Sequence, residues 1–309
     1  MKRILTIGFF LITGCILTHS ELSLQYAFMG LELWFHKMIP TLVPFMILSG
    51  IMVRMELTEG FTLFVYPFIK PLFQVSANVC YAMIMGFLCG FPMGAKTISD
   101  LYSQGLISKR EAEYLLAFCN NIGPVYFIGF VLPLLQRKLL LPYLLGMYGL
   151  PLLYGLFLRY TYYKDIPLLN ALPTQSPNSG KPKQEHGLFL ELDNTITQTL
   201  QSILSLGGYM IFFNMLNLIP HILFHKSPVY LAPLLEISGG LRLLQDSCPL
   251  YVLLLLPFGG LSCIAQTYSC IKNTPLSLAN YTLHKLILTA FTLGYYLLWF
   301  LLFSNSFMR

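Results

Sequence analysis

Long apolar runs alternate with short polar stretches over most of the chain. Apolar runs lie at residues 4–17, 38–53, 139–158 and 276–303, and polar or charged residues bound each of them. A helix of about 20 apolar residues is long enough to cross the hydrocarbon core of a bilayer. The first run follows two basic residues and is not followed by a small-x-small cleavage pattern. We therefore interpret it as an uncleaved first span whose N-terminus is cytoplasmic.

The stretches between these runs have a mixed pattern. Residues 22–38 combine apolar and charged side chains, which is typical of an amphipathic helix lying in the membrane interface. Residues 56–74 contain polar residues and two prolines, and we expect them at the membrane edge. Further crossings are expected near 114–135 and 196–219, which brings the expected total to about six.

Composition excludes several classes of protein. Hydrophobic residues make up 56% of the 309 residues and charged residues only 10%, against about 25% charged in an ordinary soluble domain. The mean hydropathy is +0.66. A cytosolic enzyme, a nucleic-acid-binding protein and a disordered chain are therefore excluded, and an all-α polytopic membrane protein is predicted, with the lipid bilayer as its surroundings.

Motifs of catalysis and metal binding are missing from the sequence. The seven cysteines show no CxxC spacing, and neither GxSxG nor HExxH occurs. The net charge of +6 is spread along the chain rather than clustered, unlike the basic patches of nucleic-acid-binding proteins. We expect no enzyme activity, no cofactor, no metal site and no nucleic-acid partner.

One apolar segment, residues 77–107, contains glycine and proline in its middle. Gly90, Pro92 and Gly94 interrupt the run. Interrupted backbone at membrane depth is tolerated only where it is buried in protein or lines a cavity. We therefore predict a re-entrant helical hairpin, in which Gly94 permits close approach of a neighbouring backbone. The polar residues after the interruption are Lys96, Thr97, Ser99 and Asp100, and the first three are candidates to bind a substrate.

A second interrupted segment has the same spacing. Residues 248–272 form an apolar run broken at Pro257, Gly259 and Gly260, for which we predict a second re-entrant hairpin. At a fixed offset of 170 residues the two segments align Gly90 with Gly260, Ala95 with Ala265, Lys96 with Gln266, Thr97 with Thr267, and Ser99 with Ser269. This alignment indicates an internal repeat.

The repeat predicts the organisation of the chain. Residues 1–163 form the first membrane repeat with the N-terminal span, 164–186 a polar, basic, cytoplasmic linker, and 187–309 the second membrane repeat. With the N-terminus inside, the two hairpins would enter from opposite faces. Inverted repeats with interrupted segments in matching positions are typical of transporters whose site lies at the bilayer midplane.

Two adjacent asparagines lie near the end of a predicted helix. Ser108 and Glu111 have the spacing of a capping box, and the helix they begin is predicted to reach Asn120 and Asn121 before an interruption at Gly123–Pro124. Their amides would bind a carboxylate or a pyridine nitrogen. The alternative is that they hydrogen-bond neighbouring helices.

Four blocks of this sequence resemble one family. They are GFPMGAKTISDLYSQGLISKREAEYLLAFCNNIGPVYF (90–127), LLEISGG (234–240), FGGLSCIAQTYSCIKNTPL (258–276) and the weaker PTLVPF (40–45). They resemble the sporulation integral membrane protein YlbJ family, also called SpoVV, within the nucleoside-recognition "Gate" group, which is similar in fold to concentrative nucleoside transporters. The resemblance implies action in the mother cell, at the outer forespore membrane of an endospore-forming bacterium. It implies dipicolinic acid as the cargo.

Charged residues at membrane depth are the first candidates for a site. Insertion of a lysine there costs about 2.5–3.5 kcal/mol, so Lys96 would face an anionic substrate; alternatively it snorkels to the interface or pairs with Asp100 at i+4. Glu236, or Asp100, would couple protons to transport; alternatively Glu236 pairs with Arg242.

The polar residues of the second segment complete the candidates. Ser262 and Gln266 would contact the substrate opposite Lys96, whereas Gly259 and Gly260 would allow close backbone approach. Helix N-termini at the interruptions would present free N–H groups to an anion.

Three functions fit the sequence. The first is a transporter of a small organic anion, the second a transporter of a nucleoside or another metabolite, and the third a structural or signalling membrane protein that transports nothing. A neutral nucleoside needs no buried cation, so Lys96 separates the first two. No GxxxxGK[ST] motif occurs, so a gradient or downstream trapping would drive transport. The sequence is compatible with an oligomer and does not give the coupling ion.

Overall fold

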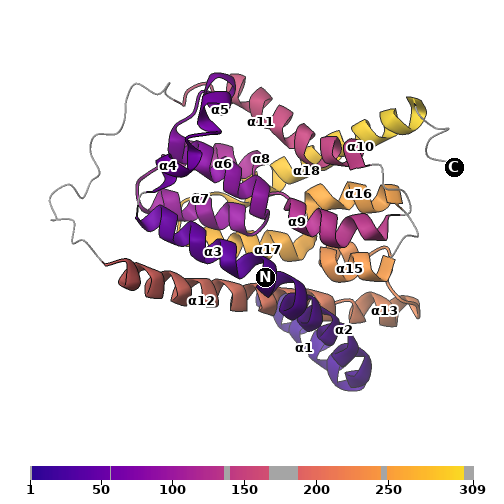
Figure 1. Cartoon of the computed structure of the whole chain (residues 1–309). Helices are drawn as coiled ribbons and strands as arrows, with labels where there is room; N and C mark the ends of the chain where they lie inside the picture. The colour runs from indigo at the N-terminus through magenta and orange to yellow at the C-terminus, as the bar shows by residue number, and fades with distance from the viewer. Residues whose placement is uncertain (1, 56, 136–139, 167–186, 245–248, 303–309) are drawn as a thin grey trace.

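The chain folds into helices joined by short turns. The computed structural model describes residues 2–55, 57–135, 140–166, 187–244 and 249–302, and in these ranges it contains helices and no strand (Figure 1). Most of the predicted linker (167–186) lies outside the described residues. The all-helical class predicted from the sequence is confirmed.

The helices of the first half end at Tyr160. They are α1 (Lys2–Thr18), α2 (Ser20–Leu33), α3 (Ile39–Arg54), α4 (Thr58–Thr62), α5 (Tyr66–Phe73), α6 (Ala77–Cys89), α7 (Met93–Ser103), α8 (Lys109–Phe118), α9 (Pro124–Tyr126), α10 (Leu140–Leu144) and α11 (Leu150–Tyr160). Single π-helical turns at Trp34–Met38, Phe127–Val131 and Leu145–Gly149, and a 3₁₀ turn at Leu132–Leu134, extend several of them.

The helices of the second half begin after the linker. They are α12 (Leu188–Met215), α13 (Leu218–Phe224), α14 (Ala232–Leu235), α15 (Ile237–Leu244), α16 (Pro249–Phe258), α17 (Gly260–Ile271) and α18 (Leu278–Leu302).

Five stretches in the described part of the chain are long and apolar enough to cross a membrane, or six if one sharply bent pair counts as a span. They are Ser20–Arg54, Leu140–Tyr160, Leu188–Phe224, Leu250–Ile271 and Leu278–Leu302, and the bent pair is Tyr66–Phe73 with Ala77–Cys89. The total agrees with the six crossings expected, but the assignment differs. The apolar part of α1, Thr6–Thr18, is shorter than a full span, and 114–135 is divided between α8 and the short segment Pro124–Leu134.

Residues 22–38 do not form a separate interfacial helix, contrary to the prediction. They belong to one 35-residue helical stretch, Ser20–Arg54, because the π-turn links α2 to α3 without a break. Glu32, one of the charged residues that suggested an interfacial helix, forms an ion pair with Arg242 at 2.6 Å. Gly30 lets α2 pack closely on α12, where an added Cβ would lie 2.7 Å from the Met210 carbonyl oxygen.

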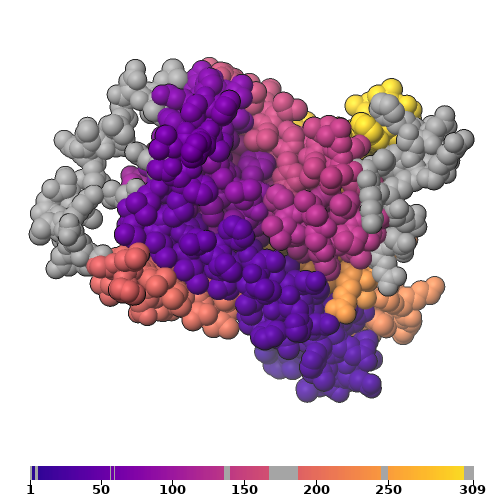
Figure 2. Space-filling model, viewed as in Figure 1, coloured from indigo at the N-terminus to yellow at the C-terminus, as the bar shows by residue number. Residues whose placement is uncertain are grey.

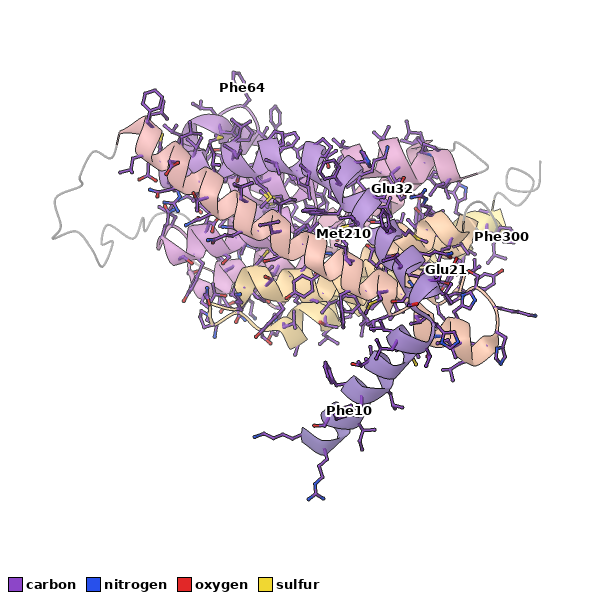
Figure 3. All side chains as sticks on the ribbon, turned by 90° about the horizontal axis from the view of Figure 1, so that it is seen from below. Phe10, Glu21, Glu32, Phe64, Met210 and Phe300 are labelled. Atoms are coloured by element: carbon purple, nitrogen blue, oxygen red, sulfur yellow. The ribbon has the colours of Figure 1, made fainter. Side chains whose placement is uncertain are left out.

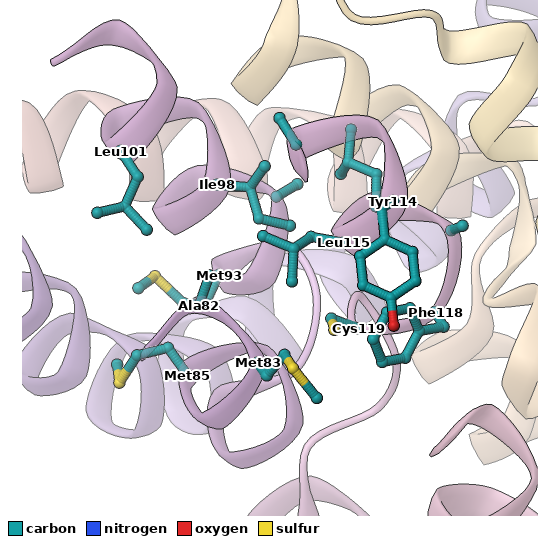
Figure 4. Close-up of a cluster of buried hydrophobic side chains, with 14 of the residues drawn as sticks. Ala82, Met83, Met85, Met93, Ile98, Leu101, Tyr114, Leu115, Phe118 and Cys119 are labelled. Carbon is teal, nitrogen blue, oxygen red and sulfur yellow. The ribbon is translucent and has the colours of Figure 1, made fainter. Parts of the chain in front are cut away.

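Apolar side chains fill the interior and also cover much of the outside. In the larger of two apolar clusters, Ala82 of α6, Ile98 of α7 and Leu115 of α8 are fully buried (Figure 4). On the outside, Phe10 and Phe64 remain 69% and 88% exposed (Figure 3). In the space-filling view the N-terminal helix α1 projects below the body (Figure 2). Exposed apolar side chains of this number suit a surface that contacts lipid.

Candidate functional site

The first interrupted segment is a hairpin, as predicted. Helices α6 and α7 pack against each other, and Gly90, Phe91 and Pro92 connect them. Gly90 has φ +74°, a conformation that residues with a Cβ rarely adopt. A Cβ there would also overlap the backbone nitrogen of Gly123. Glycine is therefore required at this turn by both backbone conformation and packing.

A second break faces this turn. The capping box of Ser108 and Glu111 begins α8, as predicted, and the helix ends at Phe118, before α9 starts at Pro124. Asn121 lies between these two helices, and its carbonyl oxygen accepts the N–H of Phe91 from the hairpin turn at 2.6 Å. Gly90 also forms a β-bridge with Ile122. The hairpin turn and the α8–α9 break therefore hold each other through backbone hydrogen bonds.

Asn120 connects this break to three helices. Its amide nitrogen donates to Thr267 Oγ1 of α17 at 3.0 Å and to the Tyr281 hydroxyl of α18 at 3.1 Å. Its amide oxygen accepts the Ala95 N–H of α7 at 3.2 Å. Every hydrogen-bonding group of this fully buried side chain thus has a partner inside the protein. These contacts match the interhelical alternative given above, and substrate binding by Asn120 stays a prediction.

Lys285 of α18 was missed by the sequence analysis. Its ammonium donates to the carbonyl oxygen of Asn120 and, at 2.9 Å, to Oδ1 of Asn121. Asn121 in turn donates to the Phe118 carbonyl oxygen at 2.5 Å. The signal in the sequence is a lysine in the middle of the apolar run 276–303, which is otherwise typical of a plain span.

The second interrupted segment is not a hairpin, contrary to the prediction. Helices α16 and α17 are separated by Gly259 alone, and residues 250–271 form one 22-residue candidate span. Gly259 and Gly260 have φ +76° and +79°, which breaks the helix without reversing it. A Cβ at Gly260 would lie 2.8 Å from the Pro233 carbonyl oxygen. The predicted close backbone approach is thus present, and so is that at Gly94, where a Cβ would lie 3.0 Å from Asn120 Oδ1.

Glu236 occupies a further break, between α14 and α15. Its carboxylate accepts the N–H groups of Ser238 at 3.1 Å and Gly239 at 2.6 Å, and the Asn214 amide at 3.0 Å. The suggested pairing with Arg242 is wrong, because Arg242 binds Glu32 instead. Glu236 is 1% exposed, and the amide donors and the N-terminal end of α15 are the groups that would stabilise its charged form against this burial.

Two cavities follow one another along the same three helices. The Glu236 cavity is lined by residues 38–45 at the start of α3, by Leu206 and Met210 of α12, and by Cys263 and Gln266 of α17. The Lys96 cavity is lined by residues 46–54 of α3, by residues 195–209 of α12 and by residues 266–273 at and just past the end of α17. Leu206 and Gln266 line both, so these two side chains form the boundary between them.

The two cavities differ in size and chemistry. The Lys96 cavity measures about 610 Å³ and the Glu236 cavity about 50 Å³. Three cations line the larger one, namely Arg54, Lys96 and Lys272, against one carboxylate, Asp100, a balance of three minus one, or +2. Arg54 also pairs with Glu191 at 3.2 Å, which lowers the excess to +1. The residues around the smaller cavity are mostly apolar, apart from a few such as Glu236 and Ser238.

The structure separates the predicted binding residues into two groups. Lys96, Ser99 and Gln266 line the Lys96 cavity together with Asp100. Thr97, Asn120, Asn121 and Ser262 are buried and hydrogen-bond within the protein. The partners of Thr97 and Ser262 are Ser49 Oγ at 3.3 Å and Gln266 Nε2 at 2.9 Å. Ser262 therefore orients Gln266 at the boundary.

Lys96 and Asp100 form an ion pair one helical turn apart. The ammonium contacts the two carboxylate oxygens at 2.5 and 2.6 Å. Both side chains are partly exposed, 20% and 29%, to the cavity. The pairing considered as an alternative is therefore present, and a contact between Lys96 and a substrate stays a prediction. No group of three or more His, Cys, Asp and Glu side chains with metal-binding geometry occurs among the described residues.

Comparison with known proteins gives one relative. No family model and no solved structure matches the chain. The sporulation integral membrane protein YlbJ of Bacillus subtilis (strain 168) is 27% identical over an alignment 310 positions long, which covers 96% of this chain and 73% of that protein. The match supports the YlbJ resemblance, while the likeness to nucleoside transporters stays a prediction. The chain is therefore an integral membrane protein homologous to YlbJ.

Proposed function

We propose that the protein transports a small organic anion across the membrane, and that the anion is dipicolinate, moved across the outer forespore membrane during sporulation. The observation that carries this proposal is the Lys96 cavity, with its volume of about 610 Å³ and an excess charge of +1 from three cations against Asp100 and Glu191. Sites for small molecules measure about 300–1,000 Å³. A cavity lined by charge of one sign concentrates counter-ions of the opposite sign.

The stacking of the two cavities supports movement through the protein. Both are lined by α3, α12 and α17, and Gln266 and Leu206 stand between them. A displacement of this boundary would open the Lys96 cavity toward the Glu236 cavity. Interrupted helices at such a boundary can rearrange, because their backbone is held by few helical hydrogen bonds. Gln266 would then contact the substrate during passage.

Charge balance favours a coupled proton. Dipicolinate carries two carboxylates at neutral pH, and Asp100 neutralises Lys96 in this conformation. The anion would compete with Asp100 for the ammonium, and protonation of Asp100 would release Lys96. Glu236 in the next cavity would then accept a proton further along the path.

Uptake into vesicles tests the function directly. Purified protein is reconstituted, and entry of labelled dipicolinate is measured against empty vesicles. Uptake that unlabelled dipicolinate competes and uridine does not is the expected result. Competition by uridine instead would favour the nucleoside alternative. Vesicles that hold folded protein and take up neither compound would support the structural alternative.

The arrangement also predicts access from opposite sides. In a cysteine-free background, Ser103→Cys would report on the Lys96 cavity and Ser238→Cys on the Glu236 cavity. Membrane-impermeant reagents are expected to label the first from the side of the linker near Ser176, taken as cytoplasmic, and the second from the other side. Labelling of both from one side would contradict the two-sided path and the predicted inverted repeat.

A further inference from the structure

Lys285 is the most deeply buried cation of the described residues outside the two cavities. It lies in the eighth position of α18 and is 1% exposed. Neither cavity includes it among its lining residues. A lysine at this depth is costly, and the role proposed for the cavities does not use it. The contacts of its ammonium therefore need a separate explanation.

Neutral oxygens and aromatic rings surround this charge. In the described part of the chain no carboxylate lies within ion-pair distance of Nζ, whose partners are the Asn120 carbonyl and Asn121 Oδ1. The ring centroids of Tyr281 and Phe91 lie 5.5 and 5.8 Å away. Carbonyl oxygens and ring faces are the groups that bind a cation without a counter-charge.

Helix α8 adds to the attraction. It ends at Phe118, two residues before Asn120, and the C-terminal end of a helix carries a partial negative charge. The residues that follow no longer use their carbonyls for helical bonds, which leaves the Asn120 oxygen free to bind a cation. Unwound carbonyls at the C-terminal end of a half-helix coordinate the coupling cation in several transporters.

We propose that the α8–α9 break is a monovalent-cation site and that Lys285 fills it with its own ammonium. The chain thereby supplies a tethered cation that fixes three parts together. Asn120 and Asn121 belong to the break, Phe91 belongs to the hairpin turn, and Lys285 belongs to α18. One consequence, which rests on the transport function proposed above, is that transport needs no sodium.

Removal of the ammonium should open the site to dissolved cations. Purified Lys285→Ala protein is heated in sodium chloride, ethylammonium chloride or choline chloride at equal ionic strength. Ethylammonium is expected to raise the Tm by about 3 °C or more over choline, and sodium by a smaller amount, since a ligand that binds only the folded state stabilises it. The unaltered protein should show the same Tm in all three salts.

A second lysine provides the matched control. Lys272→Ala removes an ammonium from an exposed position just past the end of α17, so its Tm should not distinguish ethylammonium from choline. A folded Lys285→Ala protein whose Tm is the same in all three salts would overturn the proposal.

If the Lys285→Ala protein does not accumulate, the variant Lys285→Gln tests the proposal. Lys285→Gln keeps amide donors for the same oxygens and removes the charge. The proposal expects it to have a lower Tm than the unaltered protein. Equal Tm values would show that the site needs donors and no cation. All of these readouts are independent of substrate, so they remain valid if dipicolinate uptake fails.

Discussion

The two interrupted segments share their sequence spacing and differ in shape. In the first, α6 and α7 reverse around Gly90 and Pro92. In the second, α16 and α17 continue past Gly259 as one span. The contacts explain the difference. The glycine N–H keeps a helical bond in both segments, from Gly90 to Gly86 and from Gly259 to Leu255. The first turn also hydrogen-bonds to the backbone of the α8–α9 break.

The likeness between the segments therefore concerns which side chains face the cavity. Lys96 and Gln266, aligned by the offset of 170 residues, both line the Lys96 cavity. Helices α7 and α17 also contact each other. An interruption after an apolar helix brings a polar face to the centre of the protein in both cases. A tight reversal also requires a second stretch of backbone to hold it. In the described residues the first segment has one, the α8–α9 break.

The largest expected effect is at the turn that has this partner. Gly90→Ala should prevent accumulation of folded protein, because the new Cβ would overlap the Gly123 nitrogen and the backbone has φ +74°. Gly105 offers a matched control, since it has φ +72° and nothing within 4 Å of an added Cβ. Gly105→Ala should lose only about 1–2 kcal/mol of stability from the backbone conformation.

Membrane extraction and size-exclusion chromatography measure the folded fraction of both proteins. Equal yields of folded Gly90→Ala and Gly105→Ala protein would mean that the contact with the α8–α9 break is dispensable. The shape of the hairpin would then need another cause.

The next largest effect should come from the residue that joins both segments. Asn120→Ala removes three hydrogen bonds, to Ala95 of α7, Thr267 of α17 and Tyr281 of α18. Buried groups left without partners cost about 1–3 kcal/mol each, so a loss of about 3 kcal/mol or more is expected in the free energy of unfolding. Asn217→Ala, at an equally buried asparagine that donates only to Asn214, should lose about 1 kcal/mol. Denaturation in detergent compares them, and equal losses would contradict the connecting role of Asn120.

A smaller change, in rate rather than in stability, should distinguish the aligned positions Lys96 and Gln266. Lys96→Gln gives both segments the same residue and should reduce dipicolinate uptake at least tenfold, equivalent to about 1.4 kcal/mol. Lys96→Arg should recover part of the rate, because a planar guanidinium does not replace a compact ammonium. Asp100→Asn frees Lys96 from its partner and should keep uptake at or above the original rate.

Uptake must be compared at equal amounts of protein in the membrane. An unchanged rate for Lys96→Gln would show that Lys96 serves only its ion pair with Asp100. A strong loss for Asp100→Asn would instead assign the essential role to the carboxylate.

The sequence predicted well wherever one local pattern determines the outcome. The helical class, the capping box at Ser108 and the break at Gly90 follow from nearby residues, and all are present. It predicted poorly where the outcome depends on a distant partner. The polar stretch 22–38 became part of a long helix because α12 packs against it. In the sequence Lys285 is an isolated lysine within an apolar span, and only the fold brings Asn120 and Asn121 beside it.

The smallest expected effect compares two helix starts that also align between the halves, at an offset of 169 residues. Ser108 caps α8 through the Glu111 N–H and takes part in a full capping box, whereas Ser277 caps α18 only through the Asn280 N–H at 3.2 Å. Ser108→Ala should lose about 1 kcal/mol of stability. Ser277→Ala should lose less, because α18 is 25 residues long and held by packing over most of its length. Thermal unfolding of both variants measures the difference, and a larger loss for Ser277→Ala would show that the start of α18, which positions Tyr281 and Lys285, is the weaker point of the break site.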